Sequence, residues 1–173
     1  TAATTPPGAS VASSTRQTGS GYRPAARAEG IEPHWGGTYV CIEGPQFSTL
    51  AESLTYKHLG YSVIGMTNMP EAKLAREAEI CYATAAMVTD FDCWHPDHDA
   101  VTVQDIIKVL LSNAEKAKRL VARLARDFPR EHEPCPVGSD RALDTALITA
   151  PEARDSQLIT KLDAVAGRVL KSR

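Results

Sequence analysis

The chain has 173 residues, of which 43% are hydrophobic, and this is enough for one domain with a buried core. Nineteen basic residues stand against 21 acidic ones, for a net charge of −2, so no basic excess favours nucleic acid or an anionic membrane as a partner. The four cysteines form no C-x-x-C pair, no apolar leader opens the chain, and no apolar run approaches the roughly 20 residues that span a bilayer, so we expect a soluble protein of the reduced cytoplasm.

The first 28 residues are mostly Thr, Ala, Ser, Gly and Pro, with almost no large apolar side chain. Such a composition buries too little surface to offset the entropy of ordering the chain. It predicts a disordered extension over residues 1–28, either a plain solvated segment or a tether. The folded domain is expected over residues 29–173.

Strands and helices alternate in the apolar pattern of the remainder. Thr49 and Glu52 form a capping-box pattern that predicts the start of a helix. A longer run of apolar residues at helical spacing begins behind Thr102 and ends at Pro129. We expect strands over 38–42, 61–65 and 80–89, and helices from 49 to 58 or 59 and over 71–79, 102–129 and 158–169. This order predicts a three-layer αβα domain of the α/β class with a mostly parallel or mixed sheet.

Two carboxylates follow the longest of these strands. Asp90 and Asp92 are one residue apart, so strand alternation sends both to the same side. Paired carboxylates at the carboxyl end of a buried strand can act as acid and base, or can bind the donor-rich edge of a ligand. Alternatively, one of them caps the next turn and the other is a solvated loop charge. The spacing alone does not decide between these interpretations.

Other polar positions give weaker signals. Met66 and Thr67 end the middle strand, where Thr can donate to an anion, although a Met beside a strand end more often serves packing. The turn at 44–48 has backbone N–H groups that could meet an anion, but it has neither a Walker loop nor a G-x-G-x-x-G motif. The stretch His95–Asp99 contains a proline and lacks a partner at zinc-like spacing, which favours a solvated loop, so we expect no metal site.

Several motifs stand together in a fixed order. They are Glu43–Ser48, Ala51–Ser53, Gly65–Glu71, Ala75–Glu77 and Thr89–Trp94. This series closely resembles the carboxyl-terminal half of the S-methyl-5′-thioadenosine phosphorylases, members of the purine nucleoside phosphorylase superfamily. The resemblance runs from about Gly36 to about Arg126, and the segment from His132 to Leu170 is similar to the carboxyl-terminal extension of bacterial members.

The resemblance implies a reaction and a set of ligand contacts. In that family, phosphate attacks the anomeric carbon of the nucleoside, and the products are adenine and 5-methylthioribose 1-phosphate, with phosphate as co-substrate and no cofactor. Asp90 and Asp92 would contact the adenine, Met66 the ribose and Thr67 the phosphate. An acid near N7 helps adenine to leave, and a carboxylate accepts a hydrogen bond from its exocyclic amine. Ser48 stands where 6-oxopurine enzymes of the superfamily carry glutamate, which also favours adenine.

Three apolar side chains would complete this site. The resemblance places Phe47 against the base or the sugar. Val103 falls where relatives that act on 6-oxopurines hold a histidine against the 5′-hydroxyl, and an apolar residue there suits a methylthio group because a buried unpaired donor is costly. Ile106 would extend that wall.

The chain also departs from the family pattern. In complete members an amino-terminal half supplies a glycine-rich phosphate loop and an Arg-His phosphate pair, and residues before Gly36 do not resemble that half. We therefore expect a nucleoside phosphorylase fold that is incomplete at its amino-terminal side, from a truncated or split gene, and weak or inactive alone. The implied partners are a small-molecule nucleoside, phosphate, and either two further copies in a homotrimer or a complementing amino-terminal half. The resemblance also shows Gly65 in place of a polar residue of some eukaryotic relatives, which leaves one expected sugar contact open.

Other functions remain open at this point. A nucleosidase would use water in place of phosphate. A related adenosine or purine nucleoside phosphorylase would accept a different nucleoside. A non-catalytic fragment or purine-binding module would bind the base without turnover.

Overall fold

The computed structural model describes residues 8–13, 18–96, 102–131 and 133–171 of the chain. Strands and helices alternate along much of this length, which confirms the α/β class. The four helices predicted from the sequence, which start near residues 49, 71, 102 and 158, are all present. The strands are β1 (Gly8–Ser13), β2 (His34–Trp35), β3 (Tyr39–Cys41), β4 (Val63–Gly65) and β5 (Ala83–Val88). The helices are α1 (Thr18–Ala28), α2 (Leu50–His58), α3 (Glu71–Glu77), α4 (Val103–Asp127) and α5 (Ser156–Leu170), with short 3-10 turns at η2 (Ser139–Arg141) and η3 (Pro151–Ala153).

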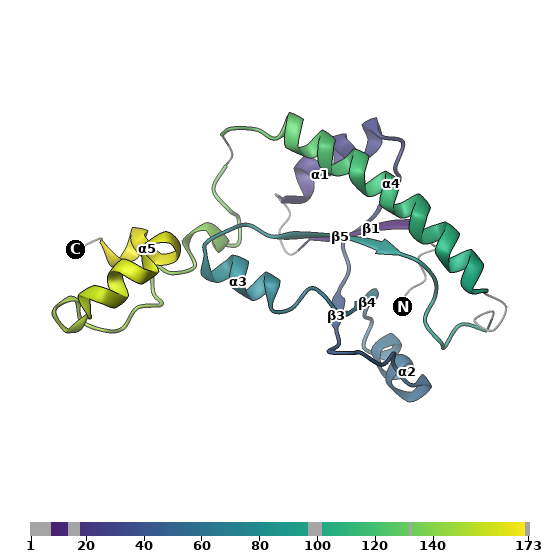
Figure 1. The fold of residues 1–173 in the computed structure, drawn as a ribbon, viewed down its shortest axis with the longest axis horizontal. Helices are drawn as coiled ribbons and strands as arrows, with labels where there is room; N and C mark the ends of the chain where they lie inside the picture. The colour runs from purple at the N-terminus through teal and green to yellow at the C-terminus, as the bar shows by residue number, and fades with distance from the viewer. Residues whose placement is uncertain (1–7, 14–17, 97–101, 132, 172–173) are drawn as a thin grey trace.

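The strands form two small sheets (Figure 1). One has the order β2-β1-β5, in which β1 runs parallel to β2 and antiparallel to β5. The other pairs β3 with β4 in parallel, with Cys41 opposite Gly65. Two of the three strand pairs are therefore parallel, in agreement with a mixed arrangement. Because β3 and β4 run in the same direction, the loops that follow them leave from the same edge.

Helices α1 and α4 cover one face of the β2-β1-β5 sheet (Figure 1). The buried core lies where these two helices meet, and it consists of Ala25, Ala26, Ile31 and Leu120. Four partly buried residues pack against it: Tyr22, Ala85, Met87 and Leu124. The core therefore joins the start of the chain to β5 and to the longest helix. In the part of the chain that the structure describes, no helix is long and apolar enough to cross a membrane.

The amino-terminal segment differs from the expected disordered extension. Residues 8–13 pair along their whole length with β5, and residues 18–28 form α1. Strand pairing uses backbone groups and needs no large side chain, while the small side chains of Ala25 and Ala26 let α1 approach Leu120 closely. A count of large apolar residues misses both kinds of contact. Residues 1–7 and 14–17 lie outside the described part of the chain.

The carboxyl-terminal helix is attached through charged groups. Figure 1 shows α5 at the end of the molecule beyond α3. Arg168 of α5 donates hydrogen bonds to both carboxylate oxygens of Glu79, at 2.7 Å from Nε and 2.5 Å from Nη2. Nη2 also donates to Asp144, and the N–H group of Leu143 donates to Glu79 at 3.0 Å. One arginine thus fastens α5 to the residues that follow α3 and η2.

Candidate functional site

The site begins with the turn into α2. The N–H group of Thr49 donates to Oε2 of Glu52 at 2.7 Å, and the N–H group of Glu52 donates to the Thr49 hydroxyl at 3.3 Å. This reciprocal pair is the capping box that the sequence predicts, and it fixes the residue at which the helix starts. The rotation of α2 is thereby set, and Ser53 faces inward with 0% of its surface exposed.

Asp92 is held by hydrogen bonds at both carboxylate oxygens. The hydroxyl of Ser53 donates to Oδ2 at 2.5 Å, and the N–H group of Cys93 donates to Oδ1 at 2.8 Å. These bonds join the loop that follows β5 to α2. A carboxylate with two donors in place has a fixed orientation, so its remaining lone pairs point in defined directions.

Asp90 lies at the carboxyl end of β5, as predicted. The hydroxyl of Thr89 donates to its Oδ1 at 2.6 Å. The end of the strand is anchored from α4, where the buried side chain of Asn113 donates to the carbonyl oxygen of Val88 at 2.9 Å. The position of Asp90 therefore depends on the contact between β5 and α4, while Asp92, two residues later, depends on α2.

An aromatic cluster holds the same loop against α2. The rings of Phe91 and His95 stack with centroids 4.2 Å apart, and Trp94 meets Phe91 edge-on at 6.4 Å. The ammonium group of Lys57 lies 3.3 Å from the centroid of the Trp94 ring, in a cation–π contact. Lys57 follows Ser53 by four residues, so one face of α2 supports both Asp92 and Trp94.

Ser48 joins this arrangement from the loop before α2. The thiol of Cys93 donates to its carbonyl oxygen at 3.8 Å. The Ser48 hydroxyl is buried, and among the described residues it has no hydrogen-bond partner. Buried hydroxyls are normally paired, so this one lacks a partner that such a group usually has. Its neighbour Phe47 is 87% exposed, and its contact with the base or the sugar stays a prediction.

The loops after β3 and β4 meet at Gly44 and Met66. A Cβ atom built on Gly44 would lie 2.6 Å from Sδ of Met66, and Gly44 has a φ of +67°, which glycine adopts readily. Thr67, the predicted phosphate contact, follows Met66 and is exposed. Tyr39 lies over Gly65, where a Cβ atom would come within 2.7 Å of Cζ of its ring. A side chain at position 65 has no room beside this tyrosine.

The two residues predicted to contact the methylthio group, Val103 and Ile106, lie at the start of α4. This helix begins with Thr102, whose hydroxyl accepts a hydrogen bond from the N–H group of Asp105 at 3.2 Å. Ile106 is half-buried in the first turn. Val103 is the first residue of the helix, but its side chain is outside the described part of the structure. Residues 97–101 are also outside it. The described residues contain no group of three or more His, Cys, Asp or Glu side chains that could hold a metal ion.

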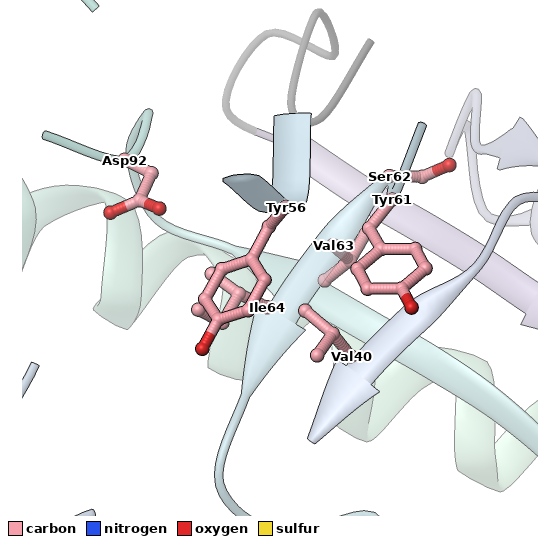
Figure 2. A pocket seen from close by; sticks show the side chains of 7 residues that line it. All are labelled: Val40, Tyr56, Tyr61, Ser62, Val63, Ile64 and Asp92. Atoms are coloured by element: carbon pink, nitrogen blue, oxygen red, sulfur yellow. The ribbon is translucent and has the colours of Figure 1, made fainter. Parts of the chain in front are cut away.

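A small pocket lies beside Asp92 (Figure 2). Figure 2 shows the rings of Tyr56 and Tyr61 side by side, with Asp92 at one end and Ser62 at the other. Val40, Val63 and Ile64 complete its lining. Apart from Asp92, no lining residue belongs to the predicted site. The pocket is thus a hollow between α2 and the β3–β4 sheet, and only its end touches the carboxylates.

The structure brings together part of the predicted set. Ser48 and Asp92 are connected through Cys93, and the loop that carries Ser48 also packs against Met66. Phe47, in the same loop as Ser48, is exposed. Sequence reasoning missed Ser53, which is part of one of the motifs but had no role assigned to it. Helical spacing counted from the capping box would have placed Ser53 and Lys57 on one face of α2.

Comparison with known proteins identifies the family. Residues 5–126 match the model of the Phosphorylase superfamily. The chain belongs to this superfamily. The match begins well before Gly36, where we expected it to start, and it includes β1, α1 and β2.

Individual relatives show which members of the superfamily this chain is most similar to among those compared. The chain is 85% identical over 147 residues to the S-methyl-5′-thioadenosine phosphorylase of Bradyrhizobium diazoefficiens, a match that covers 85% of this chain and 50% of the relative. It is 65% identical to the enzyme of that name from Cereibacter sphaeroides, over 85% of this chain and 51% of the relative. These matches confirm the resemblance to S-methyl-5′-thioadenosine phosphorylases. The chain spans about half the length of the curated relatives it matches.

Solved structures of methylthioadenosine phosphorylases also resemble this chain in fold. A methylthioadenosine phosphorylase from an antarctic soil metagenomic library superposes with a TM-score of 0.72 at 41% identity, over 91% of this chain and 57% of that protein. Methylthioadenosine phosphorylase from Schistosoma mansoni, solved in complex with adenine, gives a TM-score of 0.58 at 29% identity, over 65% and 45% of the two chains.

Proposed function

We propose that the chain provides the nucleoside-binding part of an S-methyl-5′-thioadenosine phosphorylase. The reaction is phosphorolysis of the glycosidic bond, which yields adenine and 5-methylthioribose 1-phosphate, in purine and methionine salvage. The observation that carries the proposal is the pair of carboxylates after β5, with Asp92 fixed by Ser53 and Asp90 beside it. The names of the relatives supply the substrate class.

Adenine offers chemistry that suits two carboxylates. Its exocyclic amine donates, and its N7 accepts a proton as the glycosidic bond breaks. Thr89 occupies Oδ1 of Asp90, so Oδ2 is the atom that we propose faces the base. Asp92, held by two donors, would act on the same base from a fixed angle. We also assign the Ser48 hydroxyl, which has no partner among the described residues, to the base.

We place the sugar and the phosphate at the neighbouring loops, on the basis of the resemblance. We assign Met66 to the ribose and Thr67 to the phosphate, with Phe47, Val103 and Ile106 around the base, the sugar and the methylthio group. Phosphate is a dianion and is normally held by several donors, because each charge-assisted hydrogen bond adds only part of the binding energy. One threonine is a weak site, and the chain spans half the length of its relatives. We therefore predict weak turnover, or none, by this chain alone.

The test is phosphate-dependent release of adenine from S-methyl-5′-thioadenosine. Product is separated by chromatography at increasing phosphate concentration, with and without an added chain that carries the first half of a relative. Release that rises with phosphate supports phosphorolysis. An equal rate without phosphate would identify a nucleosidase. Calorimetric binding of adenine without turnover under any of these conditions would identify a purine-binding module.

The assembly and compartment are proposals as well. From the resemblance we propose a homotrimer in the cytoplasm. Leu50 and Leu54 on α2 are 55% and 49% exposed, which is apolar surface that a subunit contact would cover. Light scattering of the purified chain would give its mass in solution, and a monomer at all concentrations would contradict the trimer.

A further inference from the structure

The two parts of the candidate site come from different sheets. Asp90 and Asp92 follow β5, which belongs to the β2-β1-β5 sheet. Met66 and Thr67 follow β4, which pairs with β3. Among the strands that the structure describes, no strand of one sheet pairs with a strand of the other. Backbone pairing therefore does not set the spacing between the carboxylates and the loop that carries Met66 and Thr67.

One side chain of that loop reaches the other sheet. Asn68 directly follows Thr67 in the chain. Its Oδ1 accepts hydrogen bonds from the hydroxyl of Tyr82 and from the hydroxyl of Thr84, both at 3.0 Å. Thr84 is the second residue of β5, and Tyr82 comes just before this strand. The two bonds thus join the loop after β4 to the beginning of β5.

The strand at one end of this link is held firmly in place. Thr84 lies opposite Ala12 in the ladder that β5 forms with β1. At the other end of β5, the side chain of Asn113 donates to the carbonyl oxygen of Val88 at 2.9 Å. The strand is therefore fixed both where it binds the loop and where it leads to the carboxylates.

The loop at the other end of the link is held through Asn68. An amide oxygen has two lone pairs, and here each one meets a hydroxyl. The carbonyl oxygen of Asn68 also accepts from the N–H group of Ala72 in α3, at 3.1 Å. The N-cap of α3, Pro70, makes no side-chain hydrogen bond, so the start of this helix offers the loop no further side-chain anchor. Asn68 therefore connects the loop to α3 by its main chain and to β5 by its side chain.

We propose that Asn68 is a positioning residue, which holds the loop with Met66 and Thr67 at a fixed spacing from the carboxylates after β5. The inference rests on the proposed function, because it takes one nucleoside to span both sheets, with its base at Asp90 and Asp92 and its sugar at Met66. A ligand gains from two groups together only when their spacing matches its own. Adenine alone needs only the carboxylates, so its binding does not depend on this spacing.

The test compares the affinities of two ligands for the full chain. Calorimetry in phosphate-free buffer gives the dissociation constants of S-methyl-5′-thioadenosine and of adenine, and their ratio measures what the sugar adds. In Asn68→Ala we expect the nucleoside affinity to fall roughly tenfold, because two neutral hydrogen bonds are lost, and the adenine affinity to stay the same. A side chain that serves stability alone would lower the midpoint of thermal unfolding and leave the ratio unchanged.

Further variants examine the two donors and the acceptor separately. Tyr82→Phe and Thr84→Val each remove one hydroxyl and should each lower the nucleoside affinity roughly threefold. Neither should have a further effect in combination with Asn68→Ala, because the shared acceptor is already gone. Asn68→Asp keeps an acceptor for both hydroxyls and should restore the ratio. The matched control is Thr160→Val on α5, whose hydroxyl donates to the carbonyl oxygen of Ser156 in its own helix at 3.0 Å, and it should leave both affinities unchanged.

The outcomes distinguish this inference from the proposed function. If the wild type binds neither ligand, both are wrong. If the wild type binds both ligands but Asn68→Ala keeps the wild-type ratio, or Asn68→Asp fails to restore it, only the positioning role of Asn68 is overturned. Equal losses of nucleoside and adenine affinity in Asn68→Ala would also overturn this role, because the residue would then act on the whole fold. The role is likewise lost if the wild type binds the nucleoside no more tightly than adenine, since the loop then adds nothing.

Discussion

Ser53 donates a hydrogen bond of 2.5 Å to Oδ2 of Asp92 across the boundary between α2 and the loop that follows β5. Ser53 has no exposed surface and Asp92 is half-buried, so the bond is partly shielded from water. The capping box at Thr49 fixes the start of α2, and Ser53 lies in the first turn that it closes. The Asp92 carboxylate is therefore held by a helix that begins 42 positions earlier in the chain.

Replacement of Ser53 by alanine should lower stability and disturb the site together. The half-buried Asp92 carboxylate loses one of its donors, and a hydrogen bond left unmatched in this way costs about 1–3 kcal/mol. Urea unfolding measures the loss, and titration calorimetry with adenine measures the change in affinity. The control is Thr55→Ala on the same helix, whose hydroxyl bonds only to the backbone of Ala51. Similar losses in both variants would contradict the role of Ser53.

Replacement of Asp90 by asparagine should change which purine binds. The carboxylate accepts from the exocyclic amine of adenine, whereas an amide can donate to the oxygen of a 6-oxopurine. We expect adenine affinity to fall about tenfold to a hundredfold, as hydrogen bonds to charged groups contribute about 1.5–3 kcal/mol, and the affinity for hypoxanthine to rise. Calorimetry with both bases is the measurement, and Asp163→Asn on α5 is the control. An unchanged preference for adenine would remove Asp90 from the site.

The attachment of α5 should weaken in acid, because it depends on the charged form of Glu79. The hydrogen bonds from Arg168, against the effect of burial, lower the pKa of Glu79 from 4.5 to about 2. A carboxyl group with a lowered folded-state pKa stabilises the fold fully above pH 4.5, and this contribution is lost as the pH falls toward 2. Melting temperatures recorded between pH 5 and pH 2 should therefore fall less steeply in Glu79→Gln than in the wild type. The exposed Glu77→Gln should keep the wild-type slope, and identical slopes in all three proteins would contradict the prediction.

Replacement of Leu120 by alanine tests the contact between α1 and α4. Leu120 is 2% exposed and packs against Ala25 and Ala26. The cavity should cost about 2–5 kcal/mol in the free energy of unfolding. Val121, its neighbour on α4, is 64% exposed, and Val121→Ala should change stability by less than about 0.5 kcal/mol. If Leu120→Ala is equally mild, α1 does not pack on α4 in solution.

The parts of the fold that local chemistry controls were predictable. The capping box at Thr49 and the Thr102 cap both involve residues three positions apart, and both helices begin where the sequence indicates. The ordering of α1 was missed because it depends on Ala26 meeting Leu120, a contact that no short window of sequence contains. The antiparallel pairing of β1 with β5 was missed for the same reason.

In the candidate site, too, the features set by neighbouring residues were predictable and the contacts between distant segments were not. Parallel strands send their loops to one edge, so the meeting of the loops after β3 and β4 at Gly44 and Met66 agrees with the expected site. The partner of Asp92 comes from a helix, and strand order alone could not name it. Phe47 is 87% exposed, and its predicted ligand contact depends on the direction of a loop side chain, which a motif does not give.

The close approach of Tyr39 to Gly65 also restricts how this protein can evolve. A polar side chain at position 65 would collide with the tyrosine ring in its present position. Such a residue can be acquired only after Tyr39 has become smaller or has turned away. Positions 39 and 65 should therefore vary as a pair across descendants of this sequence, and a single exchange at either one should be rare.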